Sequence, residues 1–128
     1  MNIVIKFLEH NLPTKTVPWS YDVYEIIEQN EIVGHIVYRY GTNEQLKYSG
    51  HIGYTIDEEY RGHGYAYMAL RDLLSIIDKD EVIITCDLDN IASYKTIEKC
   101  HVLLKEKVIG IKDKEYSQGL WRFIVKKR

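Results

Sequence analysis

The sequence has few of the residues that cross-link a fold or bind metal ions. Its 128 residues include two cysteines, Cys86 and Cys100, and neither belongs to a CxxC pair or to a spaced set of histidines and cysteines. This pattern does not predict a zinc site, and we expect no metal. Two isolated cysteines fit free thiols in a reducing compartment better than a disulfide.

Long apolar runs are also absent. No window reaches the roughly 18 consecutive apolar residues that a membrane-spanning helix needs. Residues 1–11 lack the basic segment and the small-residue cleavage site of a secretory signal. We therefore expect a cytoplasmic protein with no membrane partner.

Neither sign of charge dominates the chain. It has 17 lysines and arginines against 19 aspartates and glutamates, for a formal net charge of −2. This balance gives no bulk attraction to nucleic acid, so no nucleic-acid partner is expected. A composition of 45% hydrophobic and 28% charged residues is ordinary for a globular protein. At this length the chain can bury a core of its own, and we expect residues 1–128 to form one domain.

Both prolines lie in residues 11–20, which we expect to be a loop with room for at most one helical turn. Apolar and β-branched runs elsewhere predict strands, and Gly50 and Gly53 inside one of them suggest a bulge or a close approach by another group. The predicted strands cover residues 2–8, 21–29, 31–40, 48–56, 81–86, 102–110 and 119–127.

Two segments have the apolar spacing of helices. The first runs from residue 62 to 77, and the second covers residues 91–100 after a cap at Asp89 or Asn90. A helix between two strands at the centre of the chain implies a parallel pair. The predicted fold class is α/β (α+β). It is a twisted mixed sheet of about six or seven strands, mostly antiparallel, with a central parallel β-α-β unit and helices packed on it.

The first helix begins with two glycines, Gly62 and Gly64, beside Arg61. A helix N-terminus exposes N–H groups and the positive end of the helix dipole, and glycines let these donors close around an anion. Arg61 adds a fork-shaped cation suited to phosphate. The segment matches neither a P-loop nor a dinucleotide fingerprint. It predicts either a diphosphate-binding loop or a tight turn that needs positive φ angles.

Two motifs in this order resemble the GNAT superfamily of acyl-CoA N-acyltransferases. The pattern Arg61-x-x-Gly64-x-Ala66, between a strand and an amphipathic helix, is similar to motif A of that superfamily. Residues 89–100, DNIASYKTIEKC, are similar to the motif that follows it. The resemblance extends over roughly residues 22–109, and within the superfamily the two motifs together look like a group of bacterial predicted acetyltransferases.

The resemblance implies transfer of an acetyl group from acetyl-CoA to a primary amine, by direct attack in one ternary complex. The acceptor amine is not identified by it. The strand backbone at Tyr54, Thr55 and Ile56 would pair with pantetheine, and Asn90 and Ser93 would face the pantetheine and its thiol end. The loop that would hold the diphosphate comprises Arg61, Gly62, His63, Gly64, Tyr65 and Ala66.

The resemblance defines the catalytic residues less well, and the candidates are Asn90, Ser93, Tyr94 and His51. Many members have a tyrosine on the second helix that protonates the leaving thiolate, but its register falls here on Ile97, so Ser93 or Tyr94 could take its place. His51 lies where relatives often carry a carboxylate, and histidine titrates near neutrality. His51 is therefore the first candidate for the general base. The weaker candidates are His35, Glu25 and His63.

Two further departures concern the backbone. His101 stands where the superfamily usually has a glycine, which requires a left-handed residue or a different exit from the helix. Residues 11–20 stand where it normally has two helices that wall the acceptor site. The acceptor site could then be open, completed by the second subunit of a homodimer, or lost. The alternative function is a non-catalytic acyl-CoA-binding or sensor module.

Overall fold

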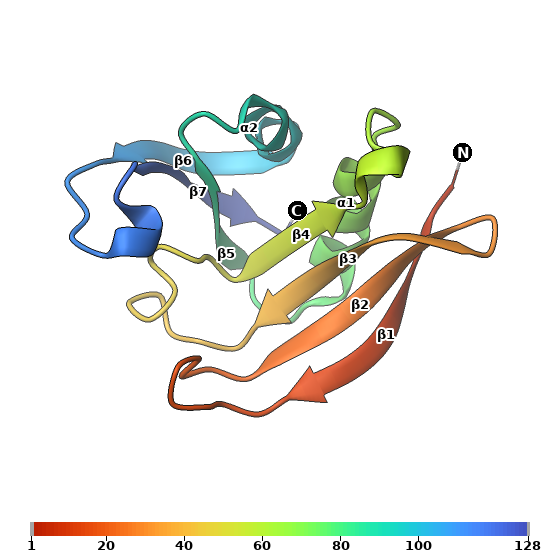
Figure 1. Cartoon of the computed structure of the whole chain (residues 1–128), viewed down its shortest axis with the longest axis horizontal. Helices are drawn as coiled ribbons and strands as arrows, with labels where there is room; N and C mark the ends of the chain where they lie inside the picture. Colours follow the sequence, from red (N-terminus) through yellow and green to blue (C-terminus); the bar gives the residue numbers. More distant parts are fainter. Residues whose placement is uncertain (1, 128) are drawn as a thin grey trace.

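The computed structural model describes residues 2–127, which contain one seven-stranded sheet with the strand order β1-β2-β3-β4-β5-β7-β6 (Figure 1). Two α-helices, α1 (Tyr65–Ile76) and α2 (Ile91–Glu98), and two short 3₁₀ helices, η1 (Glu58–Tyr60) and η2 (Lys114–Tyr116), accompany it. The strands are β1 (Val4–Asn11), β2 (Tyr21–Glu28), β3 (Glu31–Arg39), β4 (Ile52–Ile56), β5 (Glu81–Asp87), β6 (His101–Val108) and β7 (Leu120–Lys126).

All neighbouring strands run antiparallel except β4 and β5, which α1 connects as a parallel pair. The predicted mixed α+β sheet with a central β-α-β unit is therefore confirmed. The parallel pair has only one residue pairing, Ile52 with Ile84. Beyond this point the two strands separate, while β4 stays paired to β3 as far as Ile56.

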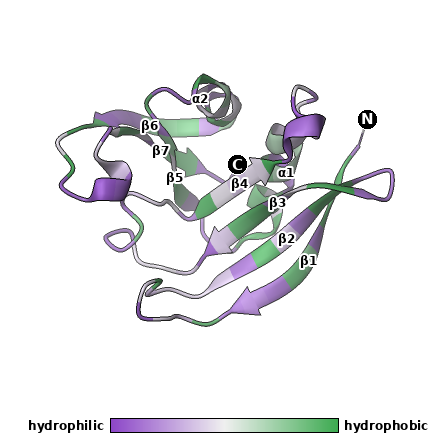
Figure 2. Ribbon diagram, viewed as in Figure 1, coloured by the Kyte–Doolittle hydropathy of each residue, from purple (hydrophilic) through white to green (hydrophobic). Residues whose placement is uncertain are grey.

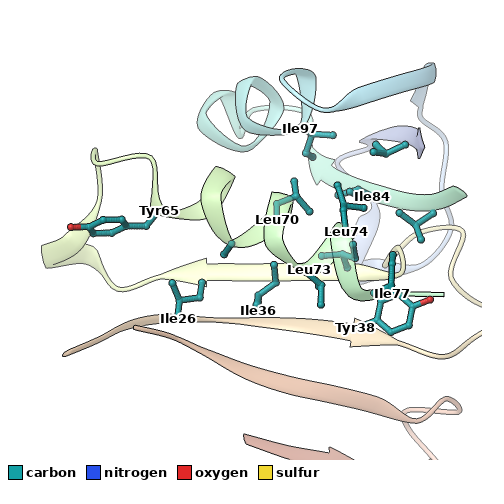
Figure 3. Packing of buried hydrophobic residues seen from close by; sticks show 14 of the residues in the cluster. Ile26, Ile36, Tyr38, Tyr65, Leu70, Leu73, Leu74, Ile77, Ile84 and Ile97 are labelled. Carbon is teal, nitrogen blue, oxygen red and sulfur yellow. The ribbon is translucent and has the colours of Figure 1, made fainter. Parts of the chain in front are cut away.

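The core lies between the sheet and the two α-helices. Leu70 and Leu73 of α1 and Ile97 of α2 are fully buried, and they pack with Ile36 and Ile84 of the central strands (Figure 3). Figure 2 shows the complementary pattern, with hydrophilic residues in η1, η2 and the loops. Because each helix has one apolar face, both helices are held against the sheet by burial of that face.

No α-helix of residues 2–127 is inserted between β1 and β2. Residues 12–20 form neither helix nor strand, so the predicted shortening of the first helical region is confirmed. Val23 and Val37, which alternate along β2 and β3 with core residues, remain half-buried as a result. Among the same residues no helix is long and apolar enough to cross a membrane.

The region before β4 corrects two predictions. The strand expected over residues 48–56 begins only at Ile52, because Gly50 closes a turn in which its N–H donates to the Leu46 carbonyl at 2.8 Å. The predicted bulge is wrong, since β4 pairs with β3 in unbroken register. Close approach does occur at Gly50, where a Cβ would lie 2.9 Å from the Ile83 carbonyl oxygen.

The exit from α2 does not use a left-handed residue. Lys99 ends the helix in a right-handed conformation, with φ −74° and ψ −13°, and His101 begins β6. Within residues 2–127, positive φ angles outside glycine occur only at Gln29 and Asn30, in the turn between β2 and β3. The histidine in place of the usual glycine is thus accommodated by a different exit.

Two glycines with similar φ angles allow the close approach at Gly50 to be tested. Gly50 has φ 76° and meets β5 backbone, whereas Gly110 has φ 73° and would meet nothing within 4 Å. Gly110→Ala should lower the free energy of unfolding by about 1–2 kcal/mol, the cost of a left-handed alanine. Gly50→Ala should lower the free energy of unfolding by about 1–3 kcal/mol more than Gly110→Ala does, because its methyl group would clash with the β5 backbone. Urea unfolding measures both, and equal losses would contradict the close approach.

Candidate functional site

A cavity of about 500 Å³ lies where β4 separates from β5, between the end of β4, the start of α1 and the first turns of α2. Every residue that was predicted to bind the cofactor lines this cavity, except His63. The ring of His63 lies 5.3 Å from the ring of Tyr65. The lining also includes Tyr60, Ala92 and Thr96, which sequence reasoning missed. Thr96 follows Ser93 at i+3 on α2, so helical spacing could have found it.

The glycines before α1 form a tight turn and leave open space beside it. Gly62 and Gly64 have φ angles of 89° and 78°, which favour glycine, so the turn itself requires them. A Cβ at Gly62 would meet nothing within 4 Å, and one at Gly64 would meet only the Met68 Cε at 3.9 Å. Gly64 is also the N-cap of α1 and offers no capping side chain. The loop is a tight turn that opens onto the cavity.

Arg61 is oriented by the end of β4. Its Nε donates to the Ile56 carbonyl at 2.9 Å, in the part of β4 that β5 no longer accompanies. The hydrogen bond uses one of the five N–H donors of the guanidinium. The terminal nitrogens remain available at the cavity wall, where a phosphate would accept from them.

Asn90 and Ser93 form the opposite wall. The Asn90 side-chain oxygen accepts from the Ser93 N–H at 3.1 Å and caps α2, which leaves its amide group for a ligand. The Ser93 hydroxyl lies 2.7 Å from the hydroxyl of Tyr54, so a hydrogen bond joins α2 to β4. Burial raises the pKa of Tyr54 to about 12, which keeps its proton in place at neutral pH.

A second cavity, of about 240 Å³, shares Tyr54, Asn90 and Ser93 with the first. Its other walls include Arg39 at the end of β3 and Asp87 at the end of β5. No sequence motif marks these two residues, because only the sheet order brings the ends of β3 and β5 to either side of β4. The shared residues connect the two cavities at the gap between β4 and β5.

The structure does not bring Tyr94 to either cavity. Its ring packs edge-on against Trp121 and Phe123, with centroids 5.2 and 5.4 Å apart, and its hydroxyl accepts from the Lys105 Nζ at 2.5 Å. Ile97, in the register of the family's tyrosine, is fully buried. Of the two residues expected to replace that tyrosine, only Ser93 lies at the site.

His51 also lies away from both cavities, against the prediction that placed it beside the acceptor. The ring is fully buried, and its Nδ1 accepts from the Ile83 N–H at 2.9 Å. Burial lowers the pKa of His51 to about 4, so the ring is neutral and ties the start of β4 to β5. The weaker candidates Glu25 and His35 face each other across β2 and β3 and line neither cavity.

The cysteines are poorly suited to nucleophilic roles. Burial raises the pKa of both thiols, Cys86 and Cys100, to about 11, so both are protonated at neutral pH. Within residues 2–127 no group of three His, Cys, Asp or Glu side chains could hold a metal ion. The cavity walls offer hydroxyl, amide and backbone groups together with the charged side chains of Arg39, Arg61 and Asp87.

A family model described as an acetyltransferase (GNAT) domain matches residues 5–102, more than half of the chain. The chain belongs to the GNAT acetyltransferase family. This confirms the family that the two sequence motifs indicated. No curated protein sequence matches the chain.

Solved structures support the same GNAT fold. The ribosomal L7/L12 alpha-N-protein acetyltransferase RimL has a TM-score of 0.65 and 25% identity, with 83% of this chain and 60% of RimL covered. RimL in complex with coenzyme A has a TM-score of 0.66 and 23% identity, with 83% of this chain and 62% of RimL covered. An acetyltransferase from Salmonella typhimurium that modifies the N-terminal serine of L7/L12 has a TM-score of 0.63 and 25% identity. The match covers 83% of this chain and 63% of that enzyme. This GNAT chain thus spans less than two thirds of these neighbours.

The buried histidine of this GNAT domain should make stability depend on pH. An unfolded histidine binds a proton near pH 6.5, but folded His51 does so only near pH 4. The contribution of His51 to the free energy of unfolding is therefore fully present above pH 6.5. About 3 kcal/mol of it is lost as the pH falls to 4.

Urea unfolding between pH 7.5 and 4 measures this loss. His51→Asn is the matched control, because its amide oxygen can accept the same Ile83 N–H and does not titrate. The variant should lose less stability over this range than the wild type. Identical pH dependence of the two proteins would contradict the buried neutral ring.

Proposed function

We propose that the chain is an N-acetyltransferase that transfers an acetyl group from acetyl-CoA to a primary amine. The observation that carries the proposal is the 500 Å³ cavity, which joins an anion-compatible loop at Arg61–Ala66 to the gap between β4 and β5. Membership of the GNAT acetyltransferase family supports it, as does the neighbour RimL, whose structure holds coenzyme A.

The cavity walls suggest how acetyl-CoA would be held. The backbone of Tyr54–Ile56 has β3 on one side and no strand on the other. The Ile56 carbonyl accepts from Arg61, and the other main-chain groups on the open side can pair with the amides of pantetheine. The N-terminus of α1 and the guanidinium of Arg61 would receive the diphosphate. The thioester would then reach the gap beside Tyr54 and Ser93.

In the proposed reaction the acceptor nitrogen attacks the thioester carbonyl carbon, so a C–N bond forms and the C–S bond breaks. Backbone N–H groups near Ile52–Tyr54 would stabilise the negative charge that develops on the carbonyl oxygen. The nitrogen loses a proton and the leaving sulfur gains one. We assign the second transfer to the Tyr54–Ser93 hydroxyl pair, because the two hydroxyls are hydrogen-bonded to each other at the gap, where the thioester would lie.

A second candidate is an acyl-CoA sensor that binds the cofactor without transfer. It is favoured by residues 12–20, which form no helix to wall an acceptor, and by Ile97 in the register of the family's tyrosine. A homodimer in which the partner covers this face stays a prediction under either function.

Titration with acetyl-CoA in a calorimeter, followed by an assay of free thiol with a panel of amines, separates the two candidates. Saturable binding with amine-dependent thiol release would establish the transferase. Saturable binding without release would favour the sensor. No binding at all would overturn both and leave the Arg61–Ala66 loop as a turn.

Arg61→Ala should raise the dissociation constant for acetyl-CoA at least about tenfold, because it removes charge-assisted hydrogen bonds to the diphosphate. The control is Arg71→Ala, an arginine on α1 that is outside the cavity and 3.6 Å from Asp72. Calorimetry compares the two variants. An affinity within twofold of wild type for Arg61→Ala would contradict the diphosphate role.

Tyr54→Phe and Ser93→Ala should each lower kcat about a hundredfold at unchanged acetyl-CoA affinity, because they remove the proton donor to the leaving sulfur. The matched control is Tyr94→Phe, which deletes a hydroxyl on α2 that faces Lys105 and neither cavity. Steady-state thiol release gives the rates. A lower kcat in Tyr94→Phe with an unchanged kcat in Tyr54→Phe would assign the proton donor to Tyr94 instead.

A further inference from the structure

The 240 Å³ cavity lies between the ends of β3, β4 and β5 and the start of α2. Ile52, Gly53 and Tyr54 of β4 line it, and Gly53 lies against the guanidinium of Arg39 on the neighbouring strand. Because the cavity shares Tyr54, Asn90 and Ser93 with the cofactor cavity, a molecule bound in it would lie beside the proposed thioester position.

Arg39 brings a half-buried cation to this cavity without an ion-pair partner. Within residues 2–127, none of its nitrogens lies within 4.0 Å of a carboxylate. One terminal nitrogen donates to the carbonyls of Ser49 and Gly50, at 3.0 and 3.2 Å. A guanidinium withdrawn from water is normally paired with an anion, so this one has donors to spare for a ligand.

The backbone holds the guanidinium in place at the cavity wall. Its second terminal nitrogen lies 2.7 Å from the point that a Cβ of Gly53 would occupy, so the group rests directly on the β4 main chain. Desolvation lowers the pKa of Arg39 from its usual 12.5, and interactions with Tyr116, Glu115 and Tyr21 partly offset this shift. An arginine held by carbonyls from one side is positioned to bind a carboxylate with its free fork.

The opposite wall carries a negative group. Asp87, exposed at the end of β5, lines the same cavity, and within residues 2–127 it has no cation within 4.0 Å. It lies at the start of the turn to α2, where the Asn90 N–H donates to its carbonyl at 3.0 Å. The cavity thus has a cation on the β3 side and an anion on the β5 side, next to the transfer point.

We propose that this cavity is the acceptor subsite and takes a small amine that also carries a carboxylate, with the carboxylate on Arg39 and the ammonium on the Asp87 side. The ammonium would release one proton to solvent before its neutral nitrogen attacks, and would lose the second on transfer. The proposal rests on the proposed acetyl transfer, of which it names the acceptor class. A free amino acid has both charges a few ångströms apart. A cavity of about 240 Å³ is smaller than the ~300–1,000 Å³ of sites for drug-sized ligands, which favours a single amino acid over a length of peptide.

The test compares acceptors that differ only in the carboxylate. Thiol release is measured with free amino acids and with their amides, for wild type, Arg39→Met and Arg39→Lys. Wild type should prefer the carboxylate by at least about tenfold in kcat/KM, the size of a charged hydrogen bond. Arg39→Met should abolish the preference for the carboxylate by raising the KM for free amino acids, and Arg39→Lys should keep part of the preference. Acetyl-CoA affinity should not change.

Arg71→Met is the matched control. Arg71 lies on α1 outside both cavities and is 3.6 Å from Asp72, so its loss removes the same charge away from the subsite. This variant should keep the wild-type preference. Equal loss in Arg71→Met and Arg39→Met would overturn the proposal, because the effect would then reflect net charge alone.

The remaining outcomes separate this proposal from acetyl transfer itself. Thiol release with amides as fast as with amino acids would overturn the acceptor class and keep the transferase. Release only with peptides would overturn the small acceptor. If no amine releases thiol, calorimetry of the coenzyme A-bound protein with amino acids decides. Binding that Arg39→Met abolishes would support the subsite without the transferase, and no binding would overturn the subsite.

Discussion

The arrangement of this protein depends on the single residue pairing between β4 and β5. Ile52 pairs with Ile84, and beyond it the strands separate while β3 and β7 keep their own neighbours in register. The side of β4 that faces the gap therefore carries unpaired main-chain groups next to hollow space. A closed sheet at this point would satisfy those groups internally and leave no room for a ligand.

The gap in the sheet explains why one short segment can serve two cavities. Tyr54 and Ser93 are joined across it by a hydrogen bond, and both residues line the larger and the smaller cavity. His51 helps to define where the gap begins, because its buried ring accepts an N–H from β5 just before the only residue pairing. A residue that looked like a catalytic base is better explained as part of the framework of the gap.

Much of the fold was predictable because local patterns and global structure agree. The apolar periodicity of α1, the continuous apolar run of β5 and the prolines of residues 11–20 each indicated the element that forms. The cofactor side was predictable for a similar reason, since its residues lie in two contiguous motifs around α1 and α2. His63 escaped the pattern because neighbouring residues in a turn need not face the same side.

The sequence by itself determined the order of the elements, the glycine-rich start of α1 and the family. These features are local, encoded by spacing within one segment. Only the tertiary structure decided which way Tyr54, Tyr94 and His51 face, and it alone brought Arg39 and Asp87 to one cavity. These positions follow from strand order and register, which pair residues far apart in the chain. The spacing of residues within a single segment therefore cannot predict them.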